Sequence, residues 1–519
     1  MNSVNVSRKY SPFFYITKPT GIVIIFFLLL LAGCNFPDPE TSALVDAGSQ
    51  QTGEPENLTP NGLVSPTVLP HGSLLPAETP SELDEGYIHY TTQQGDTVSA
   101  LASRFNVPVE EIHVDFSKTP QTLLPIGLEL LIPDILGKTL ICGEPLLPDS
   151  EVIYGASVDN FDATSFALEA GGFLATYMEV VDPETMLGPD IVQRVAIETS
   201  TNPRLLLAFL EYRSGWVYGF PEGAADDLYP LGYGAGGDTG LYKELMITAK
   251  LLSQGFYGWR EGNLVELKFF QGESQRLPPG LNAGSVALMH LFAGLYTFDG
   301  WDHQLCEPAS FINFYQNMFG NYWDRATKVE PYLSADIQPP ILALPFAVGE
   351  TWSFTGGPHI TWQTGTPWGA LDFAPVTGES HCAVSIRWVT AAAPGLIVRS
   401  ERSVVALDLD GDGDEGTGWV LVYHHVAAED RLPVGAWVEQ DASIGHPSCE
   451  GGQASGTHLH FARKFNGEWQ GVEAPFPLIL SGWQVFADEK PYQGFLQKGD
   501  DVINASPCGC GESLIMREE

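Results

Sequence analysis

Histidines are concentrated in the last third of this 519-residue chain, where they could bind a metal ion or transfer protons. Seven of the twelve histidines lie between residues 359 and 460. Neutral imidazole is the commonest zinc ligand and a good general base. Two of these histidines form the run His458-Leu459-His460, and residues two apart on a β-strand share one face of a sheet. We therefore expect His458 and His460 to address one site.

A second group of metal-binding side chains is the alternating run of aspartates from Asp408 to Asp414. Carboxylate oxygens suit Ca²⁺, but the register of an EF-hand loop fails, because the twelfth residue counted from Asp408 is Trp419 and not glutamate. The sequence favours a solvated acidic turn between two strands and keeps a Ca²⁺ site as the alternative.

Short β-rich segments surround the histidines and are separated by Gly, Pro and Asp turns. They indicate an antiparallel β-sheet domain over residues 345–495, followed by a C-terminal tail over residues 496–519. The segments are 388–392, 395–399, 404–409, 419–425 and 456–463.

The segment "IGHPSCEGGQASGTHLHFARKFNGEW" around the histidine pair resembles the closing motif of lysostaphin/LytM-type zinc peptidases. The resemblance implies that His460 binds zinc and that His458 contacts the attacking water. The run "WVLVYHHV" is similar to the Tyr-x-His strand of that family, which implies His425 as the second catalytic histidine. The neighbouring His424 should point to the opposite face of the sheet, as a solvated or packed residue.

The stretch "LDFAP" is similar to the family's Asp-x-Ala-x-Pro stretch, which implies Asp372 as a further zinc ligand. The family's first histidine ligand normally lies four residues earlier, where this chain has Trp368. The nearest preceding histidine is His359, thirteen residues before the aspartate. We expect an inserted loop that still lets His359 reach the metal, since loop insertions cost little free energy. The alternative is a lost ligand and a defective site; His381 and His446 are weaker substitutes, because neither lies at a motif position.

Two neutral imidazoles and one carboxylate would hold Zn²⁺ with a net charge of +1 and leave one position open for water. Bound zinc lowers the pKa of such a water towards ~7 and polarises the scissile carbonyl. His425 and His458 would orient the water, accept its proton and stabilise the oxyanion. The predicted function is a zinc endopeptidase of peptidoglycan peptides. The alternative is a catalytically defective domain that binds the wall and regulates other peptidoglycan hydrolases.

The first residues predict export from the cytoplasm. A basic segment precedes the apolar run of residues 21–31, which is well short of the ~20 residues needed to span a bilayer. The next residues, "LAGC", resemble a bacterial lipobox. We therefore predict a lipoprotein signal peptide over residues 1–33 and a lipid on Cys34 that anchors the protein to the outside of the membrane; an ordinary signal peptide is the alternative. Residues 34–85 are rich in Pro, Ser, Thr, Gly and acids and lack Lys and Arg, which predicts a disordered linker.

Residues 86–134 predict a small βααβ unit. The run "QQGDTVSALASRFNV" places apolar residues at helical spacing, with Thr97 as the expected cap of the first helix. The unit resembles a LysM module, which implies binding to the N-acetylglucosamine-containing glycan of peptidoglycan or chitin. A packing domain with a degenerate groove is the alternative.

Residues 140–340 predict a helical domain, with helical periodicity at 190–196, 204–211, 240–254 and 282–295. The segments "NPRLLLAFLEYRSGW" and "NAGSVALMHLFAG" resemble lysozyme-like lytic transglycosylases. In those enzymes a glutamate just before Ser-Gly protonates the glycosidic oxygen, but this chain has Arg213 there. Glu211 lies two residues earlier, on another helix face. We therefore expect a non-catalytic domain.

The domains predicted above together give a multidomain α+β fold class. The net charge of −39, with only 25 Lys and Arg, argues against nucleic acid as a partner. Besides Cys34, six cysteines allow 15 disulfide connectivities. Closeness within domains favours Cys142 with Cys306 and Cys382 with Cys449, whereas Cys508-Gly-Cys510 alone is a weak metal signal.

Overall fold

The computed structural model describes nine stretches of the chain, namely residues 86–112, 122–140, 142–221, 228–234, 239–307, 310–362, 367–378, 381–509 and 511–518. The predicted signal peptide, Cys34 and the linker lie outside these residues. In the stretches that are described, no helix combines the length and the apolar character needed to cross a bilayer.

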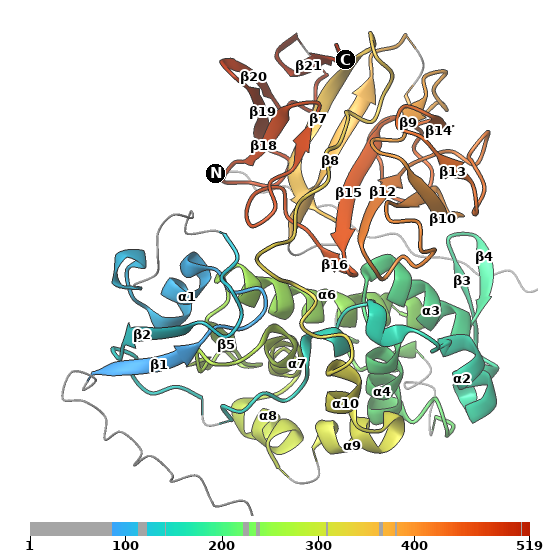
Figure 1. Cartoon of the computed structure of the whole chain (residues 1–519). Helices are drawn as coiled ribbons and strands as arrows, with labels where there is room; N and C mark the ends of the chain where they lie inside the picture. The colour runs from blue at the N-terminus through green and yellow to red at the C-terminus, as the bar shows by residue number, and fades with distance from the viewer. Residues whose placement is uncertain are drawn as a thin grey trace, which may run out of the picture. The chain divides into compact units, whose positions relative to one another are not determined.

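The N-terminal module pairs strand β1 (Tyr87–Thr91) antiparallel with β2 (Glu129–Pro133) (Figure 1). Between them lie helix α1 (Val98–Phe105) and the 3-10 turn η1 (Val109–Glu111). The Thr97 hydroxyl accepts the N–H of Ala100 at 3.2 Å, so the predicted cap is confirmed. The second predicted helix is a single 3-10 turn within the described residues, which stop at 112 and resume at 122.

The middle region is helical, as predicted. Four of its helices, α3, α4, α6 and α7, coincide with the four periodic segments. Its helices are α2 (Ala163–Ala170), α3 (Gly188–Thr199), α4 (Pro203–Ser214), α6 (Leu241–Arg260), α7 (Ala283–Ala293), α8 (Phe298–Leu305), α9 (Phe311–Phe319) and α10 (Tyr322–Ala326). The described residues of this region also form two hairpins and three 3-10 turns: β3 (Met178–Val181) with β4 (Glu184–Leu187), β5 (Glu266–Lys268) with β6 (Ser274–Arg276), η2 (Asp149–Glu151), η3 (Ala156–Val158) and η4 (Phe173–Ala175).

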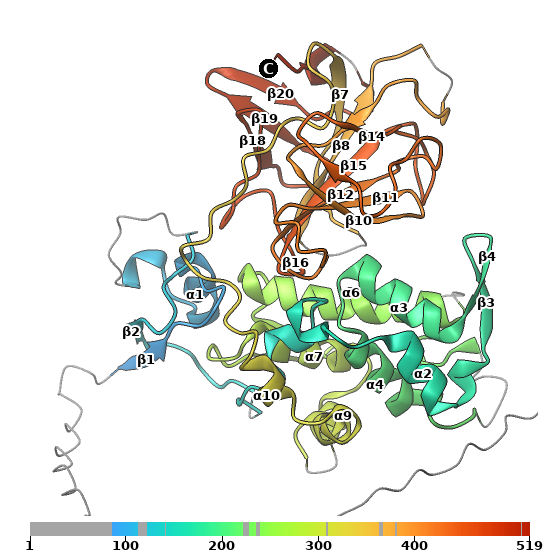
Figure 2. The same ribbon diagram turned by 45° about the vertical axis from the view of Figure 1, so that its right-hand side comes forward.

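The C-terminal region is built on one antiparallel sheet, with strand order β13-β10-β11-β12-β15-β8-β7-β21 (Figures 1 and 2). The predicted sheet domain is confirmed. Its strands are β7 (Thr351–Ile360), β8 (Trp368–Pro375), β10 (Gly395–Glu401), β11 (Val404–Asp408), β12 (Trp419–His424), β13 (Trp437–Val438) and β15 (Leu459–Phe465). The short strand β16 (Glu468–Trp469) folds back on β15, and β9 (Val389–Thr390) pairs with β14 (Ser443–Gly445).

Residues 496–519 are not a tail, which corrects the prediction. A second sheet is formed by β17 (Ile479–Leu480), β18 (Trp483–Ala487), β19 (Gly494–Lys498) and β20 (Asp501–Asn504). After the turn η5 (Gly511–Ser513), strand β21 (Leu514–Met516) pairs with β7 and forms the edge of the first sheet. Ile515 is buried in the core of the sheet domain, and the buried Arg517 donates to the carbonyls of Leu344 and Phe346. These long-range partners explain why local sequence patterns do not reveal the strand.

The disulfides Cys142–Cys306 and Cys382–Cys449 are both formed, with Cα–Cα distances of 6.1 and 5.1 Å. Both predicted pairs are confirmed. Cys508 is also disulfide-bonded, which removes its thiol from metal binding.

The hairpin of β15 and β16 packs against the helical region (Figures 1 and 2). The backbone N–H of the buried Trp469 donates to the hydroxyl oxygen of Tyr257 of α6 at 2.9 Å, and its indole N–H donates to the carbonyl of Thr199 at the end of α3. Arg260 of α6 lies 3.3 Å from the carboxylate of the buried Glu468. One end of β15 is thus held by the helices.

Candidate metal centre

Three neighbouring strands carry the predicted zinc ligands. His460 of β15 is directly opposite Asp372 of β8, and β7 lies on the other side of β8 with His359 near its end. The register of β7 shifts on both sides of Gly356, which opposes Asp372. A Cβ on Gly356 would lie 2.5 Å from the Asp372 carboxylate, so this place requires glycine. His359 therefore reaches the aspartate from an irregular strand, and the predicted inserted loop corresponds to the connection between the end of β7 at Ile360 and the start of β8 at Trp368.

The nitrogen and oxygen atoms of these three side chains converge at the end of the sheet. The distance from His359 Nε2 to Asp372 Oδ1 is 3.4 Å, and His460 Nδ1 lies 3.3 Å from the same oxygen. The two imidazole nitrogens are 3.1 Å apart. All three side chains are buried, and together they form a group that could hold a metal ion.

The protonation pattern of the group favours a cation. His359 Nδ1 and His460 Nε2 lie 2.8 Å from the carbonyls of Gly357 and Thr361. A carbonyl only accepts, so these nitrogens carry ring hydrogens, and the facing Nε2 and Nδ1 atoms present lone pairs when the rings are neutral. Among the described residues, Asp372 Oδ1 is buried without a hydrogen-bond partner. Three acceptor atoms facing one another fit a bound metal ion.

The charges at the site agree with this arrangement. Burial alone would raise the pKa of Asp372. The adjacent His359 and His460 lower it by more than burial raises it, so the pKa of Asp372 lies well below its ordinary value. Burial lowers the pKa of His359, and the Asp372 carboxylate outweighs this and raises it overall. The group therefore attracts positive charge.

The two predicted catalytic histidines lie beside this group. His425 Nδ1 donates to the carbonyl of Glu450 at 2.8 Å, and His458 Nδ1 donates to that of Gly456 at 2.7 Å. Their Nε2 atoms are left as acceptors, and the ring centroids are 4.5 Å apart. His458 Nε2 lies 3.8 Å from Asp372 Oδ1. Burial and the neighbouring His458 lower the pKa of His425 to about 4, which keeps that ring neutral at physiological pH.

His424 is on the same side of the sheet as the metal group, which corrects the prediction that it points to the opposite face. It pairs with His460 in the register of β12 and β15. Its ring stacks on His425 at 4.1 Å and lies 4.8 Å from that of Trp362. His425 follows the last residue of β12 and has a φ of +63°, so the alternation of side chains ends there. His424 is a packed residue, as the sequence suggested, but it belongs to the wall of the site.

The remaining histidines and one tyrosine complete the surroundings. His446 donates to the carbonyl of Arg387 and packs on Trp388, away from the metal group. His381 lines a cavity of about 500 Å³ that also borders Asp372, His458 and Tyr492. The ring of Tyr492 stacks on His359 at 4.2 Å. Sequence reasoning missed this tyrosine, because it arrives from the connection between β18 and β19.

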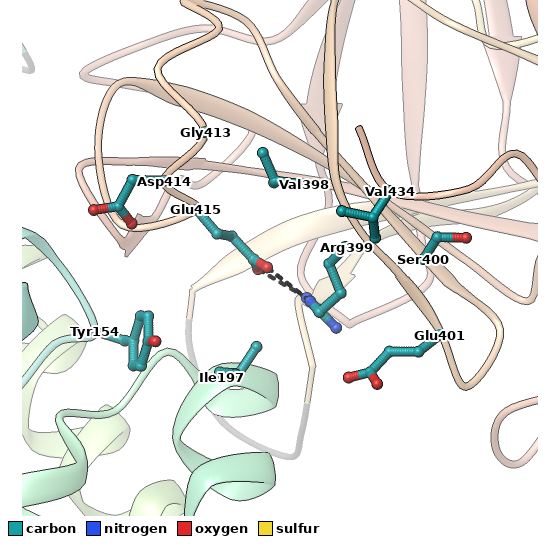
Figure 3. Close-up of a pocket in the computed structure, with 10 residues that line it drawn as sticks. All are labelled: Tyr154, Ile197, Val398, Arg399, Ser400, Glu401, Gly413, Asp414, Glu415 and Val434. Carbon is teal, nitrogen blue, oxygen red and sulfur yellow. Dashed lines mark hydrogen bonds and ion pairs between the residues drawn. The ribbon is translucent and has the colours of Figure 1, made fainter. Parts of the chain in front are cut away.

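A larger cavity of about 570 Å³ is lined by none of the predicted zinc ligands or catalytic histidines (Figure 3). It lies between the helices and the sheet, where Tyr154 faces Arg399 and Glu415. Arg399 makes two hydrogen bonds to the Glu415 carboxylate, at 2.7 and 2.8 Å, and Lys464 adds a third contact at 3.0 Å. Burial raises the pKa of Glu415, but the two cations lower it to about 2. The Glu415 carboxylate is therefore paired with two cations and serves the structure.

The aspartate run lies in the turn after β11. Asp408, Asp410 and Asp412 bring carboxylate oxygens within 4.8 Å of one another. Asp408 accepts the backbone N–H groups of Asp410, Gly411 and Gly413, which an acidic turn alone explains. Calcium at this turn stays a prediction.

The helical region shows how the residues of the lysozyme-like motif are used. Glu211 accepts the backbone N–H groups of Val217 and Tyr218, at 2.8 and 3.0 Å, and so closes the turn after α4. Arg213 donates to the carbonyl of Leu231. Both side chains are engaged in local structure.

Comparison with known proteins adds relatives for both regions. A family profile described as LasA, N-terminal domain matches residues 145–332, where the lysozyme likeness stays a prediction. Protease LasA of Pseudomonas aeruginosa is 25% identical over 353 residues, covering 63% of this chain and 75% of that protein. Beta-lytic metalloendopeptidase of Lysobacter enzymogenes is 28% identical over 160 residues, covering 29% of this chain and 83% of that protein. The solved structure titled "A Novel M23 Metalloprotease Pseudoalterin from Deep-sea" is 23% identical with a TM-score of 0.28, covering 32% of this chain and 95% of that one. The chain is similar to proteases, a metalloendopeptidase among them.

Proposed function

We propose that this protein is a zinc metalloendopeptidase that hydrolyses peptide bonds of peptidoglycan. The observation that carries the proposal is the meeting of His359 Nε2, Asp372 Oδ1 and His460 Nδ1, three buried acceptor atoms. Two neutral imidazoles and a carboxylate are a zinc donor set, and both rings have their second nitrogen bonded to a carbonyl, which is typical of metal-ligating histidines.

The roles of the other side chains follow from their geometry. Zinc, when bound, supplies Lewis acidity towards the scissile carbonyl and the attacking water. His425 and His458 each keep Nε2 free to accept a proton, because Nδ1 is bonded to a backbone carbonyl. The lowered pKa of His425 keeps this ring in the neutral form that a base needs. The cavity that borders Asp372, His458 and Tyr492 would receive the peptide.

Targeting to the wall is the second part of the proposal. The resemblance of residues 86–134 to a LysM module supports binding to peptidoglycan glycan, and the β1–α1–η1–β2 order agrees with that resemblance. The lipobox-like sequence at Cys34 supports a lipid anchor that holds the protein outside the cytoplasm. The N-terminal module would then bind the same polymer, peptidoglycan, that the C-terminal site hydrolyses.

The competing function is a wall-binding regulator without catalysis. It depends on the absence of a first histidine ligand, since Trp368 occupies the usual position. The 3.4 Å distance from His359 Nε2 to Asp372 Oδ1 favours the peptidase, because His359 is close enough to share an ion with the aspartate.

A digest of purified sacculi tests the proposal. The zinc-loaded full-length protein should release new amines from sacculi, and His359→Ala should abolish this release. His446→Ala is the matched control, because that histidine packs on Trp388 away from the metal group. Amine release that is unchanged in His359→Ala would contradict the proposed site. Cleavage of a protein substrate without amine release from sacculi would contradict the wall substrate.

A further inference from the structure

One buried serine connects the two histidines that flank the metal group. Ser448 lies in the connection between β14 and β15 and is 1% exposed. It forms an antiparallel bridge with His458, whose backbone N–H donates to the Ser448 carbonyl at 3.3 Å. On its other side it contacts the backbone of His425. Nothing in the sequence motifs assigns a task to this residue.

The backbone of His425 needs such support. Its φ of +63° lies in the left-handed region, which residues with a Cβ adopt uncommonly. The carbonyl of His425 accepts two hydrogen bonds from Ser448, one from the backbone N–H at 2.8 Å and one from the hydroxyl at 2.9 Å. This conformation turns the ring of His425 towards His458, directly after the last residue of β12.

The same hydroxyl also orients the ring of His425. Ser448 Oγ accepts the backbone N–H of Glu450 at 3.0 Å, and the carbonyl of Glu450 accepts the Nδ1–H of His425 at 2.8 Å. One hydroxyl thus donates its only hydrogen to the backbone of His425 and fixes the peptide that holds its ring. Cys449, between these two residues, is joined to Cys382 by a disulfide, which anchors the connection.

We infer that Ser448 is a positioning residue for the hydrolysis, because it sets the places of His425 and His458 relative to each other. The inference rests on the proposed function, in which the free Nε2 atoms of these two rings handle the proton of the attacking water. Removing the hydroxyl would leave the Glu450 N–H without its partner and the His425 carbonyl with one donor in place of two. The metal group would keep all its contacts, because Ser448 touches none of its three side chains.

The test compares Ser448→Ala with Ser448→Thr, which keeps a hydroxyl, in the zinc-loaded full-length protein. The rate of amine release from purified sacculi is measured at saturating and at limiting sacculus concentration, together with bound zinc and the melting temperature. We expect kcat of Ser448→Ala to fall about 10- to 100-fold, as for other residues that orient catalytic groups, with KM and bound zinc unchanged. Ser448→Thr should recover part of kcat.

Ser385→Ala is the matched control, since it removes a buried hydroxyl of the same domain that accepts only the N–H of Arg387 among the described contacts. Its kcat should equal that of the wild type. A kcat of Ser448→Ala equal to that of the control would overturn the inference, and so would a fall that occurs only with loss of zinc. A wild-type protein that binds zinc but releases no amines would contradict the proposed function instead, which separates the two failures.

Discussion

The two ends of strand β15 differ in the partners of the buried carboxylate that lies beside each of them. At the start of the strand, His460 and the opposing Asp372 present acceptor atoms to each other, and Asp372 Oδ1 accepts no hydrogen bond from a described residue. Near its end, Lys464 meets Glu415, whose carboxylate is also bound twice by Arg399. Burying charge is costly unless it is paired. Glu415 is thus paired with two cations of the chain, whereas Asp372 faces two imidazoles.

The largest effect is expected from removing the unpaired carboxylate. Asp372→Asn should lower amine release from sacculi by at least about 10³-fold, because a metal ion contributes several kcal/mol to catalysis. In a urea titration above the pKa of His359, the folded apoprotein should be as stable as the wild type, since neutral imidazoles do not depend on this charge for neutralisation. A strongly destabilised apoprotein would show that the carboxylate serves the structure, as Glu415 does.

The opposite result is expected at the other end of the strand. Glu415→Gln leaves Arg399 and Lys464 buried without their shared carboxylate, so the free energy of unfolding should fall by about 3 kcal/mol. The kcat of the folded variant should remain that of the wild type. Urea unfolding and amine release, measured on the same preparation, separate the effect on stability from the effect on kcat. If Glu415→Gln were as stable as the wild type, the two ends of β15 would not differ in the way described.

The same ion pairs predict how stability depends on pH. The pKa of Glu415 is about 2 in the folded chain and near 4.3 in an unfolded one. A lowered folded pKa stabilises the protein fully above the unfolded pKa, and this contribution of about 3 kcal/mol is lost as the pH falls from ~4.3 through 2. Acid unfolding of the wild type should therefore be steeper over this window than that of Glu415→Gln. If the wild type and Glu415→Gln lost stability equally as the pH falls, the assignment of this pH dependence to Glu415 would be wrong.

The smallest effect concerns the two adjacent histidines. His425→Gln should lower kcat by about 10²-fold or more, because it removes a proton acceptor, whereas His424→Gln should lower it by less than about 10-fold. His424 stacks on the rings of His425 and Trp362 and donates its Nε2–H to the carbonyl of Gly451. Equal losses of kcat in the two variants would mean that His424 has a chemical role of its own.

The sequence predicted what depends on short-range pattern. The run His458-Leu459-His460, the strand that ends at His424 and the stretch around Asp372 were recognisable as motifs, and the helices α3, α4, α6 and α7 followed from periodicity. Both intradomain disulfides followed from domain proximity. In each case the informative residues are neighbours in the chain or belong to one domain.

Long-range and irregular features were not predictable in this way. The strand position of His359 depends on the register shifts of β7 around Gly356, and the side of His424 depends on the positive φ of His425. Tyr492 reaches His359 only because a separate sheet brings it there. The strand β21 and the ion pairs of Glu415 likewise depend on partners far away in the sequence. A one-dimensional pattern carries none of this information.

Zinc binding by the full-length protein tests the central claim most directly. The chain, stripped of metal by a chelator and titrated with Zn²⁺, should bind one ion tightly at the group of His359, Asp372 and His460. His359→Ala should weaken this binding strongly, while Glu415→Gln should bind as the wild type does. A wild-type chain that takes up no zinc, or a His359→Ala variant with unchanged affinity, would contradict the account.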